Sequence, residues 1–184
     1  MSTDRENIDR EPTDHLIDAA DIDGDDHDTE EAWLLGALLW ARRAEVERAA
    51  ELLDPADFHR PLHAELFALI AREARAGRGH RPPDILAALA AEGGTAGHRG
   101  GQAARALTAA TTSGADPLRL PVHAYLVCAA AARRATILAA HDLLDAAERA
   151  GEHELFPRLL AHGRAARARE QRMACLRAWS GREP

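Results

Sequence analysis

The sequence predicts an all-α protein, a compact helical head of about five short helices followed by a long antiparallel helical hairpin. Hydrophobic residues make up 46% of the 184 residues, yet aromatic residues make up only 4%. Alanine, leucine, arginine and glutamate dominate instead, a composition that favours helices over strands. Apolar residues recur every three or four positions along most of the chain, as on one face of a helix.

Residues 1–28 are predicted to form a disordered acidic tail. Seven aspartates stand between Asp14 and Asp28, against only Arg5 and Arg10. Concentrated like charge with few apolar residues cannot offset the entropy lost on ordering. The formal net charge of the whole chain is -7, and this negative charge belongs to the tail. We therefore expect the folded part to be close to neutral.

Residues 29–115 are predicted to form the head, from helices with recognisable starts and stops. A capping residue begins a helix, proline suits its first turn, and glycine or a residue before proline ends it. The first helix is expected to begin with Asp28 as N-cap and Glu31 three residues later, and the second to extend from Glu45 to Leu53. The third is expected between Pro61 and Gly77, and the fourth between Pro82 and Gly93-Gly94. A glycine-rich loop from Gly93 to Gly101 then leads to a fifth helix through Leu107.

Residues 116–180 are predicted to form the hairpin. No glycine and no internal proline occur from about Pro121 to Ala150, which indicates one long helix. Gly151 interrupts it, and a last helix is expected from near Phe156 to near Trp179; two long helices joined by a short turn lie antiparallel. Their apolar stripes predict a self-association surface composed of Val122, Leu126, Ile137, Leu144, Leu159, Met173 and Leu176.

The chain contains no lysine, since all 23 of its basic residues are arginine. A Walker A loop needs a lysine to reach the transferred phosphates, and Schiff-base chemistry needs a lysine amine. We also find no serine, threonine or cysteine nucleophile near a base. We therefore expect no ATPase activity from this chain and no catalytic, cofactor-binding or metal-ligating residues.

The sequence predicts a cytoplasmic location, because it lacks the segments that direct export or membrane insertion. No signal peptide and no apolar run of roughly 18–20 residues is present, so neither export nor a membrane span is expected. Cys128 and Cys175 are far apart and suit reduced thiols in a cytoplasmic protein. Their numbers average close to the predicted hairpin turn, so we expect them at similar heights along the two helices.

His59 and His63 are four residues apart, a spacing that can place two imidazoles on one helix face as zinc ligands. However, Pro61 lies between them and no glutamate follows. We favour the alternative that His63 and Phe67 pack with Phe58 to fix a turn. Gly36, inside a predicted helix, is interpreted as a point of close helix packing, and Asp54 and Asp57 as ordinary turn and capping residues.

The last helix carries six arginines against one acid, Glu170. Arg164, Arg167 and Arg169 are candidates for contacts with nucleic-acid phosphates. The alternative, which we favour because the sequence pI is near 5.8, is a solvated face or pairing with the acidic tail.

The stretch from Leu52 to Phe67 contains Asp57-Phe58, Arg60, His63 and Phe67, and it resembles the signature of the N-terminal domain of DnaB-type replicative helicases. The resemblance covers roughly residues 30 to 165. Further matches in the same order are Leu35, Gly36 and Leu39 upstream, then Asp84-Ile85, Gly100-Gly101, Tyr125 within Val122–Val127, and Arg133-Arg134.

This resemblance implies an all-α head and a hairpin used for self-association. In full-length helicases the region forms a collar that assembles subunits and receives primase, and the ATPase domain follows it. We therefore expect a non-catalytic protein-interaction module in DNA replication, a homo-oligomer (a dimer through the hairpin) that binds a primase-like or helicase-like partner. The alternatives are a DNA-binding regulator that uses the last helix, and a helical enzyme or small-molecule binder, which would need a deep polar pocket.

Overall fold

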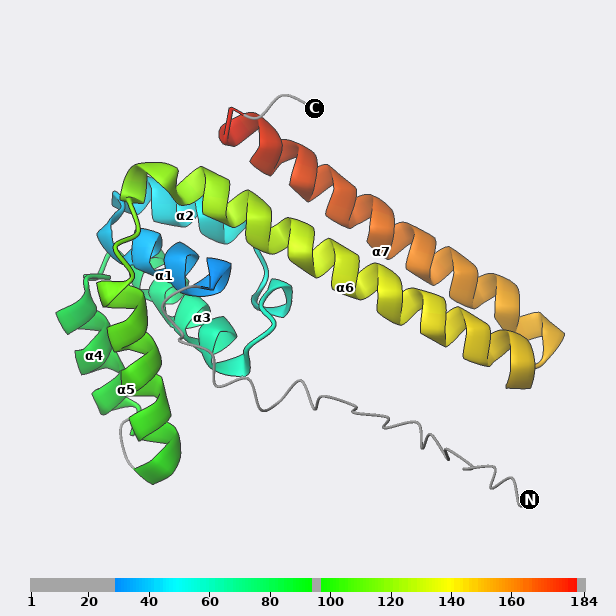
Figure 1. Cartoon of the computed structure of the whole chain (residues 1–184), viewed down its shortest axis with the longest axis horizontal. Helices are drawn as coiled ribbons and strands as arrows, with labels where there is room; N and C mark the ends of the chain where they lie inside the picture. The colour runs from blue at the N-terminus through cyan, green and yellow to red at the C-terminus, as the bar shows by residue number, and fades with distance from the viewer. Residues whose placement is uncertain (1–28, 94–96, 182–184) are drawn as a thin grey trace, which may run out of the picture.

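The computed structural model describes residues 29–93 and 97–181, and every regular element within them is helical (Figure 1). The predicted acidic tail, residues 1–28, and Gly94 lie outside the described residues. The all-α prediction, with five short helices before a hairpin, is confirmed. The helices are α1 Glu30–Trp40, α2 Arg43–Leu52, α3 Pro61–Arg75, α4 Pro82–Ala91, α5 Gly97–Thr112, α6 Leu120–Arg149 and α7 Glu152–Trp179, with short 3-10 turns at Pro55–Asp57 and Pro117–Arg119.

Helix α1 is the centre of the head. It contacts α3, α5 and α6, and its side chains Leu34, Leu35, Leu38 and Leu39 are all completely buried. A helix that is apolar on every side is stable only when other elements cover it all round, and the surrounding helices do so here. The core of the molecule is therefore built around α1.

Gly36 allows α5 to approach α1 closely, as the sequence predicted. A Cβ atom at this position would lie 2.4 Å from Ser113 Oγ and 2.5 Å from the carbonyl oxygen of Ala110. Glycine costs up to about 1 kcal/mol relative to alanine inside a helix. That cost is accepted because no larger residue fits against the end of α5.

Arginine side chains cap the ends of two head helices. Arg81 donates hydrogen bonds to the carbonyl oxygens of Leu39 and Trp40 at 3.3 and 2.8 Å, at the end of α1. At the end of α2, Arg172 donates to the carbonyl oxygen of Leu52 at 3.3 Å. The last carbonyl groups of a helix lack partners within the helix, and a guanidinium group satisfies them and complements the helix dipole.

The start of α1 differs from the prediction. Thr29, not Asp28, is the N-cap, and its hydroxyl accepts a hydrogen bond from the Ala32 N–H at 3.2 Å. Glu31 does not complete a capping box, because its side chain turns into the head and binds residues of the α3 region. Tertiary partners thus outweigh the local capping pattern.

Two other helices start earlier than predicted. Helix α5 begins at Gly97, so Gly100 and Gly101 lie inside a helix rather than in a loop. Helix α7 begins at Glu152 rather than near Phe156, and Pro157 therefore lies inside it. At the sixth position of α7, this proline removes one backbone hydrogen bond and its ring crowds the carbonyl group four residues back, yet the helix continues through it.

Helices α6 and α7 form the predicted antiparallel hairpin, and Figure 1 shows its turn far from the head. The first half of α6 packs on α1, and the end of α7 returns to α2. Leu176 is fully buried there, and the guanidinium group of Arg48 lies 4.9 Å from the centre of the Trp179 ring. No helix in the described parts of the chain has the length and apolar character that a membrane crossing requires.

Candidate protein-interaction surface

Glu31 joins α1 to the segment that precedes α3. Its carboxylate accepts hydrogen bonds from the backbone N–H groups of His59 and Arg60, at 2.5 and 3.3 Å, and lies 2.9 Å from Nδ1 of His63. Burial alone raises the pKa of Glu31, but the hydrogen bonds from His63, His59 and Arg60 together lower it below its usual range. The contact therefore favours a charged carboxylate in the interior of the head.

This network gives His63 a structural role. His63 is 1% exposed and its Nδ1 lies 2.9 Å from the Glu31 carboxylate, while the rings of Phe58 and Phe67 pack against each other with centroids 4.9 Å apart. Among the described residues, no group of three or more histidine, cysteine or acidic side chains could hold a metal ion. The motif residues from Asp57 to Phe67 thus build the turn between α2 and α3.

Asp57 joins the head to the hairpin. Its carboxylate accepts two hydrogen bonds from Arg172 on α7, at 2.6 and 3.0 Å, and one from the Asp54 N–H at 2.8 Å. Arg134 on α6 also donates to the Asp57 carbonyl oxygen at 2.6 Å. Sequence reasoning found the capping role of Asp57 but missed both arginines, because no local pattern connects positions 77 and 115 residues apart.

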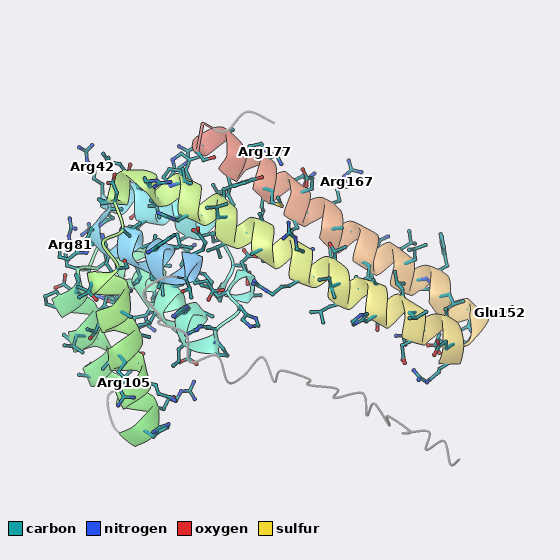
Figure 2. The ribbon with its side chains drawn as sticks, viewed as in Figure 1. Arg42, Arg81, Arg105, Glu152, Arg167 and Arg177 are labelled. Carbon is teal, nitrogen blue, oxygen red and sulfur yellow. The ribbon has the colours of Figure 1, made fainter. Side chains whose placement is uncertain are left out.

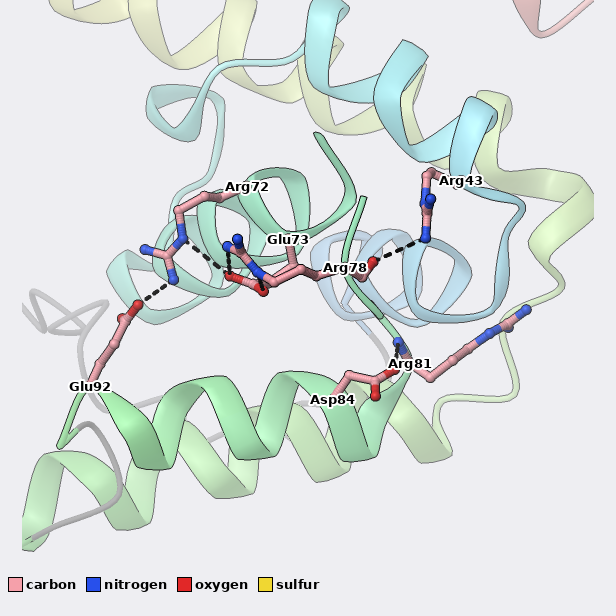
Figure 3. Close-up of polar contacts among 7 residues, drawn as sticks. All are labelled: Arg43, Arg72, Glu73, Arg78, Arg81, Asp84 and Glu92. Carbon is pink, nitrogen blue, oxygen red and sulfur yellow. Dashed lines mark hydrogen bonds and ion pairs between the residues drawn. The ribbon is translucent and has the colours of Figure 1, made fainter. Parts of the chain in front are cut away.

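A polar cluster lies in the head where α3 leads into α4 (Figure 3). Glu73 is buried and accepts hydrogen bonds from Arg78 at 2.5 and 2.8 Å and from Arg72 at 3.3 Å. The hydrogen bonds from Arg78 lower the pKa of Glu73 to about 2. These charged side chains hold the loop between α3 and α4 in place. Arg43 on α2 also donates a hydrogen bond to the carbonyl oxygen of Arg78 in this loop.

The cavity beside this cluster has a volume of about 460 Å³ and is lined by α3, α4 and α5. Its four charged side chains pair with one another, Arg72 with Glu92 and Arg99 with Glu65. All four are about half exposed or more. Among its described lining residues, the cavity therefore has no buried, unpaired titratable group of the kind that catalysis uses.

The outer part of the hairpin carries most of the exposed apolar side chains. Of the nine large hydrophobic residues that are exposed within the described chain, six lie here. We call these six residues the hairpin surface. They are Ile137, Leu138, Leu144, Phe156, Leu159 and Leu160, with exposed fractions between 40% and 67%. Because exposed apolar residues are concentrated on this part of the molecule, it is the candidate interaction surface.

Of the seven residues that the sequence assigned to self-association, some are exposed in the structure and others pack against the head. Ile137, Leu144 and Leu159 belong to the hairpin surface, whereas Val122 and Leu126 are half-buried near the head. Met173 packs against the core, and Leu176 is fully buried in it, so the assignment of Leu176 to an interface is wrong. Apolar residues at the same helical spacing are exposed to solvent in the outer hairpin, but they pack against the head near the end of α7.

Leu138, Phe156 and Leu160 are members of the hairpin surface that sequence reasoning missed. The sequence predicts that the last helix starts near Phe156, whereas this residue lies in the second turn of α7. Leu138 and Leu160 lie directly beside predicted stripe residues, and a stripe drawn at strict helical spacing omits such neighbours.

A small, partly exposed polar cluster ties the two helices of the hairpin together. Asp142 on α6 lies 2.7 Å from Nε2 of His162 and 3.4 Å from Arg158, both on α7. The hydrogen bond from His162 lowers the pKa of Asp142. These contacts fix the register of the hairpin, so that residue 142 stands opposite residues 158 to 162.

The three candidate phosphate-binding arginines lie on the middle of α7. Arg164 and Arg167 are exposed, and Figure 2 shows Arg167 on the side of α7 turned away from α6. Arg169 is half-buried, and burial of the nearby Cys128 raises the pKa of that thiol to about 11. Within the part of the chain that the structure describes, none of the three arginines forms an ion pair with a carboxylate.

The fold and these contacts define an all-α module, a leucine-rich head that is bonded through Asp57 to a projecting hairpin. The family model for the DnaB-like helicase N-terminal domain matches residues 26–119, slightly more than half of the chain. The chain therefore belongs to this family, and the resemblance seen in the sequence is confirmed. The family implies a replication-related module.

A solved structure supports the same fold. The crystal structure of the N-terminal domain of DnaB helicase from Mycobacterium tuberculosis is similar with a TM-score of 0.62 and 20% sequence identity. The match covers 72% of this chain and 92% of that one. At this identity the likeness shows the fold alone. A comparison with curated proteins found no significant match.

Proposed function

We propose that this protein is a non-catalytic assembly module of DNA replication, which self-associates through its hairpin and binds a primase-like or helicase-like partner. The observation that carries the proposal is the hairpin surface, six large apolar side chains exposed on two helices that project from the head. A role beside a replicative helicase would place the protein in the cytoplasm.

The energetics of the hairpin support self-association. Burying one large aliphatic or aromatic side chain contributes about 1.5–3 kcal/mol. The side chains of Leu144 and Phe156 are 61% and 66% exposed, so most of this contribution is unused in a single chain. A second hairpin could cover both, as helices in a bundle cover one another.

The chemistry of the chain supports a partner-dependent role. A motor of the P-loop type uses a lysine at the phosphates, and this sequence has none. The buried acids of the described head, Glu31, Asp57 and Glu73, are occupied by structural bonds. The apolar side chains of the hairpin surface and the exposed arginines of α7 remain accessible, and groups of this kind suit binding.

The oligomeric state of Leu144→Glu tests the proposal, measured by light scattering after size exclusion across micromolar concentrations. We expect the wild-type protein to be oligomeric and the variant to be monomeric, because a buried glutamate is costly in an interface. Leu118→Glu is the matched control, since Leu118 is 82% exposed but lies in the 3-10 turn before α6. A monomeric wild-type protein would overturn self-association.

Partner binding is tested separately, with purified primase and replicative helicase from the same organism. Binding of either one to the wild-type protein supports the proposal. Binding of neither, by calorimetry at concentrations where the protein is oligomeric, contradicts this part of it and leaves self-association standing.

A second candidate function is DNA binding through α7, favoured by the side chains of Arg164 and Arg167, which are exposed and have no ion-pair partner among the described residues. Phosphate contacts of this kind weaken as salt rises. Replacing Arg164, Arg167 and Arg169 with alanine should then abolish a salt-dependent shift of DNA in a gel. Equal shifts for the variant and the wild-type protein would exclude these arginines.

A further inference from the structure

Among the described residues, four arginines of the hairpin take part in no ion pair and no hydrogen bond of their side chains. The neighbouring arginines are engaged, because Arg134 and Arg172 bind Asp57 and Arg177 pairs with an acid of α7. We call the four residues the arginine belt. They are Arg133 on α6 and Arg164, Arg167 and Arg169 on α7, of which the first three are exposed and the last is half-buried.

The belt occupies a short length of the hairpin. The bond between Asp142 and His162 gives the register, by which facing residues have numbers that average about 152. Arg167 and Arg164 therefore stand opposite α6 positions of about 137 and 140. Together with Arg133, the belt extends over about seven helical positions, or about 10 Å. Unpaired charges of one sign that lie so close together produce a positive local potential, which attracts acidic groups.

The acidic tail, residues 1–28, carries the complementary charge. It has eleven acids and two arginines, and therefore a formal charge of -9. The acids are densest at the end of the tail that adjoins Thr29. Within the last eight residues, which contain no arginine, they are Asp21, Asp23, Asp25, Asp26 and Asp28.

The tail joins the described chain beside α6. The carboxylate of Glu30 lies 3.1 Å from Nδ1 of His123, and the ring of Trp33 also contacts His123, with ring centroids 5.9 Å apart. Arg133 follows His123 by ten positions, so the belt begins about 15 Å from this point along α6 and ends about 26 Å from it. Eight extended residues span at most about 29 Å, so residues 21–28 can reach the belt.

We propose that the acidic tail of this chain binds the arginine belt of the same chain, with the aspartates of residues 21–28 on Arg133, Arg164 and Arg167. The proposal goes beyond the proposed function, because it requires neither a partner nor a second copy. A nucleic acid or an acidic protein that binds the belt must then first displace the tail.

The strength of the contact comes from the covalent connection. Each exposed ion pair contributes little by itself. A tail that is tethered close to the belt, however, has an effective concentration of about a millimolar or more, which a free acidic ligand has to exceed. Because all the charges involved are exposed, salt should release the tail.

Cys175 provides a site-specific probe for the test. It is exposed, whereas Cys128 is completely buried, so a thiol-reactive nitroxide labels Cys175 alone in the folded, full-length protein. Cys175 is eight positions from Arg167 on the same helix, or about 12 Å. We expect the label to broaden the amide NMR signals of residues 21–26, and high salt to remove most of this broadening.

The belt variant separates binding from mere proximity to the label. It combines Arg133→Gln, Arg164→Gln and Arg167→Gln in the labelled protein, and it should lose at least about half of the broadening. The matched control removes the same charge at three exposed arginines outside the hairpin, and it should keep the wild-type broadening. Its changes are Arg42→Gln, Arg105→Gln and Arg119→Gln.

A reciprocal experiment observes the belt and changes the tail. The tail variant combines Asp21→Asn, Asp23→Asn, Asp25→Asn and Asp26→Asn, and it should shift the side-chain Nε–H signals of Arg164 and Arg167. The control removes four acids from the outer hairpin instead, and it should leave these two signals within a small fraction of that shift. Its changes are Asp145→Asn, Glu148→Gln, Glu152→Gln and Glu154→Gln.

Each outcome decides the proposal. Broadening that depends on the belt, together with arginine signals that depend on the tail, supports it. Tail signals that are the same in wild type and belt variant overturn it. Broadening that appears only when spin-labelled chains are mixed with isotope-labelled chains places the tail on another copy, which also overturns it. None of these results bears on self-association, so the proposed function stands or falls separately.

Discussion

Arg172 on α7 donates two hydrogen bonds to the carboxylate of Asp57, at 2.6 and 3.0 Å, across 115 positions of sequence. The Asp57 side chain is 4% exposed and that of Arg172 is 31% exposed, so the pair lies mostly out of water. The pKa of the Arg172 guanidinium is raised, chiefly by its hydrogen bond to Asp57. This pair, with Arg134 on α6, sets the direction in which the hairpin leaves the head.

Replacing Asp57 with asparagine should destabilise the protein. The change removes a charge and leaves the Arg172 guanidinium without its counterion, which costs about 3 kcal/mol for a largely buried pair. Urea denaturation followed by circular dichroism measures the loss. Asp54→Asn is the control, because Asp54 only caps the adjacent 3-10 turn at the surface. Equal losses in both variants would contradict the role given to the pair.

Two glycine substitutions should have opposite signs. Gly36→Ala places a Cβ within 2.5 Å of the Ala110 carbonyl oxygen, and overpacking of this kind costs about 1–3 kcal/mol. Gly163→Ala, inside α7, meets nothing within 4 Å and should gain up to about 1 kcal/mol from helix propensity. Melting temperatures of both variants check the prediction, and a stabilised Gly36→Ala would refute the close approach of α5.

Acid should remove the contribution of Glu31 to stability. The folded pKa of Glu31 lies below its ordinary value of 4.5, so the unfolded chain takes up the proton first as pH falls. The contribution is therefore complete above pH 4.5 and is lost as pH falls through the lower, folded pKa. The difference in unfolding free energy between wild type and Glu31→Gln should shrink over that range.

Glu51→Gln, which removes an exposed carboxylate from α2, is the control for the loss of one negative charge. A difference for Glu31→Gln that stays constant down to the acid-unfolding transition would show that the Glu31 carboxylate is not held in its charged form.

Pro157→Ala should stabilise the hairpin. Alanine supplies an N–H for the His153 carbonyl oxygen and removes a ring that opposes the helix, a gain of about 1 kcal/mol or more. Pro61→Ala is the matched control, since Pro61 occupies the first position of α3, where no N–H is needed. Similar changes in melting temperature for the two variants would contradict the continuous helix across Pro157.

The parts of the fold that depend on local signals were predictable. Pro61 and Pro82 begin helices where the sequence placed them, and Gly36 has the packing role expected of it. The hairpin register also followed from the position of the turn. The bond between Asp142 and His162, whose numbers average 152, agrees with the heights expected for Cys128 and Cys175, and both cysteines are free thiols.

The parts that depend on distant residues were not predictable. Glu31 had the correct spacing for a capping box, but a buried partner on another helix is a stronger contact than a terminal N–H. Leu176 and Leu144 have the same apolar character, and only the return of α7 to the head decides which of them is buried. Helical periodicity identifies a face but not what covers it.

Both helices of the hairpin are fastened at their head ends, α6 through Arg134 and α7 through Arg172 and Leu176. The 28 residues of α7 span about 42 Å, so a change of angle at the head end is amplified along the hairpin. A tilt of about 5° at the head would displace the far end by roughly 4 Å at that length. A small rearrangement of the head, such as one caused by a partner that binds there, would thus produce a larger displacement at the turn of the hairpin.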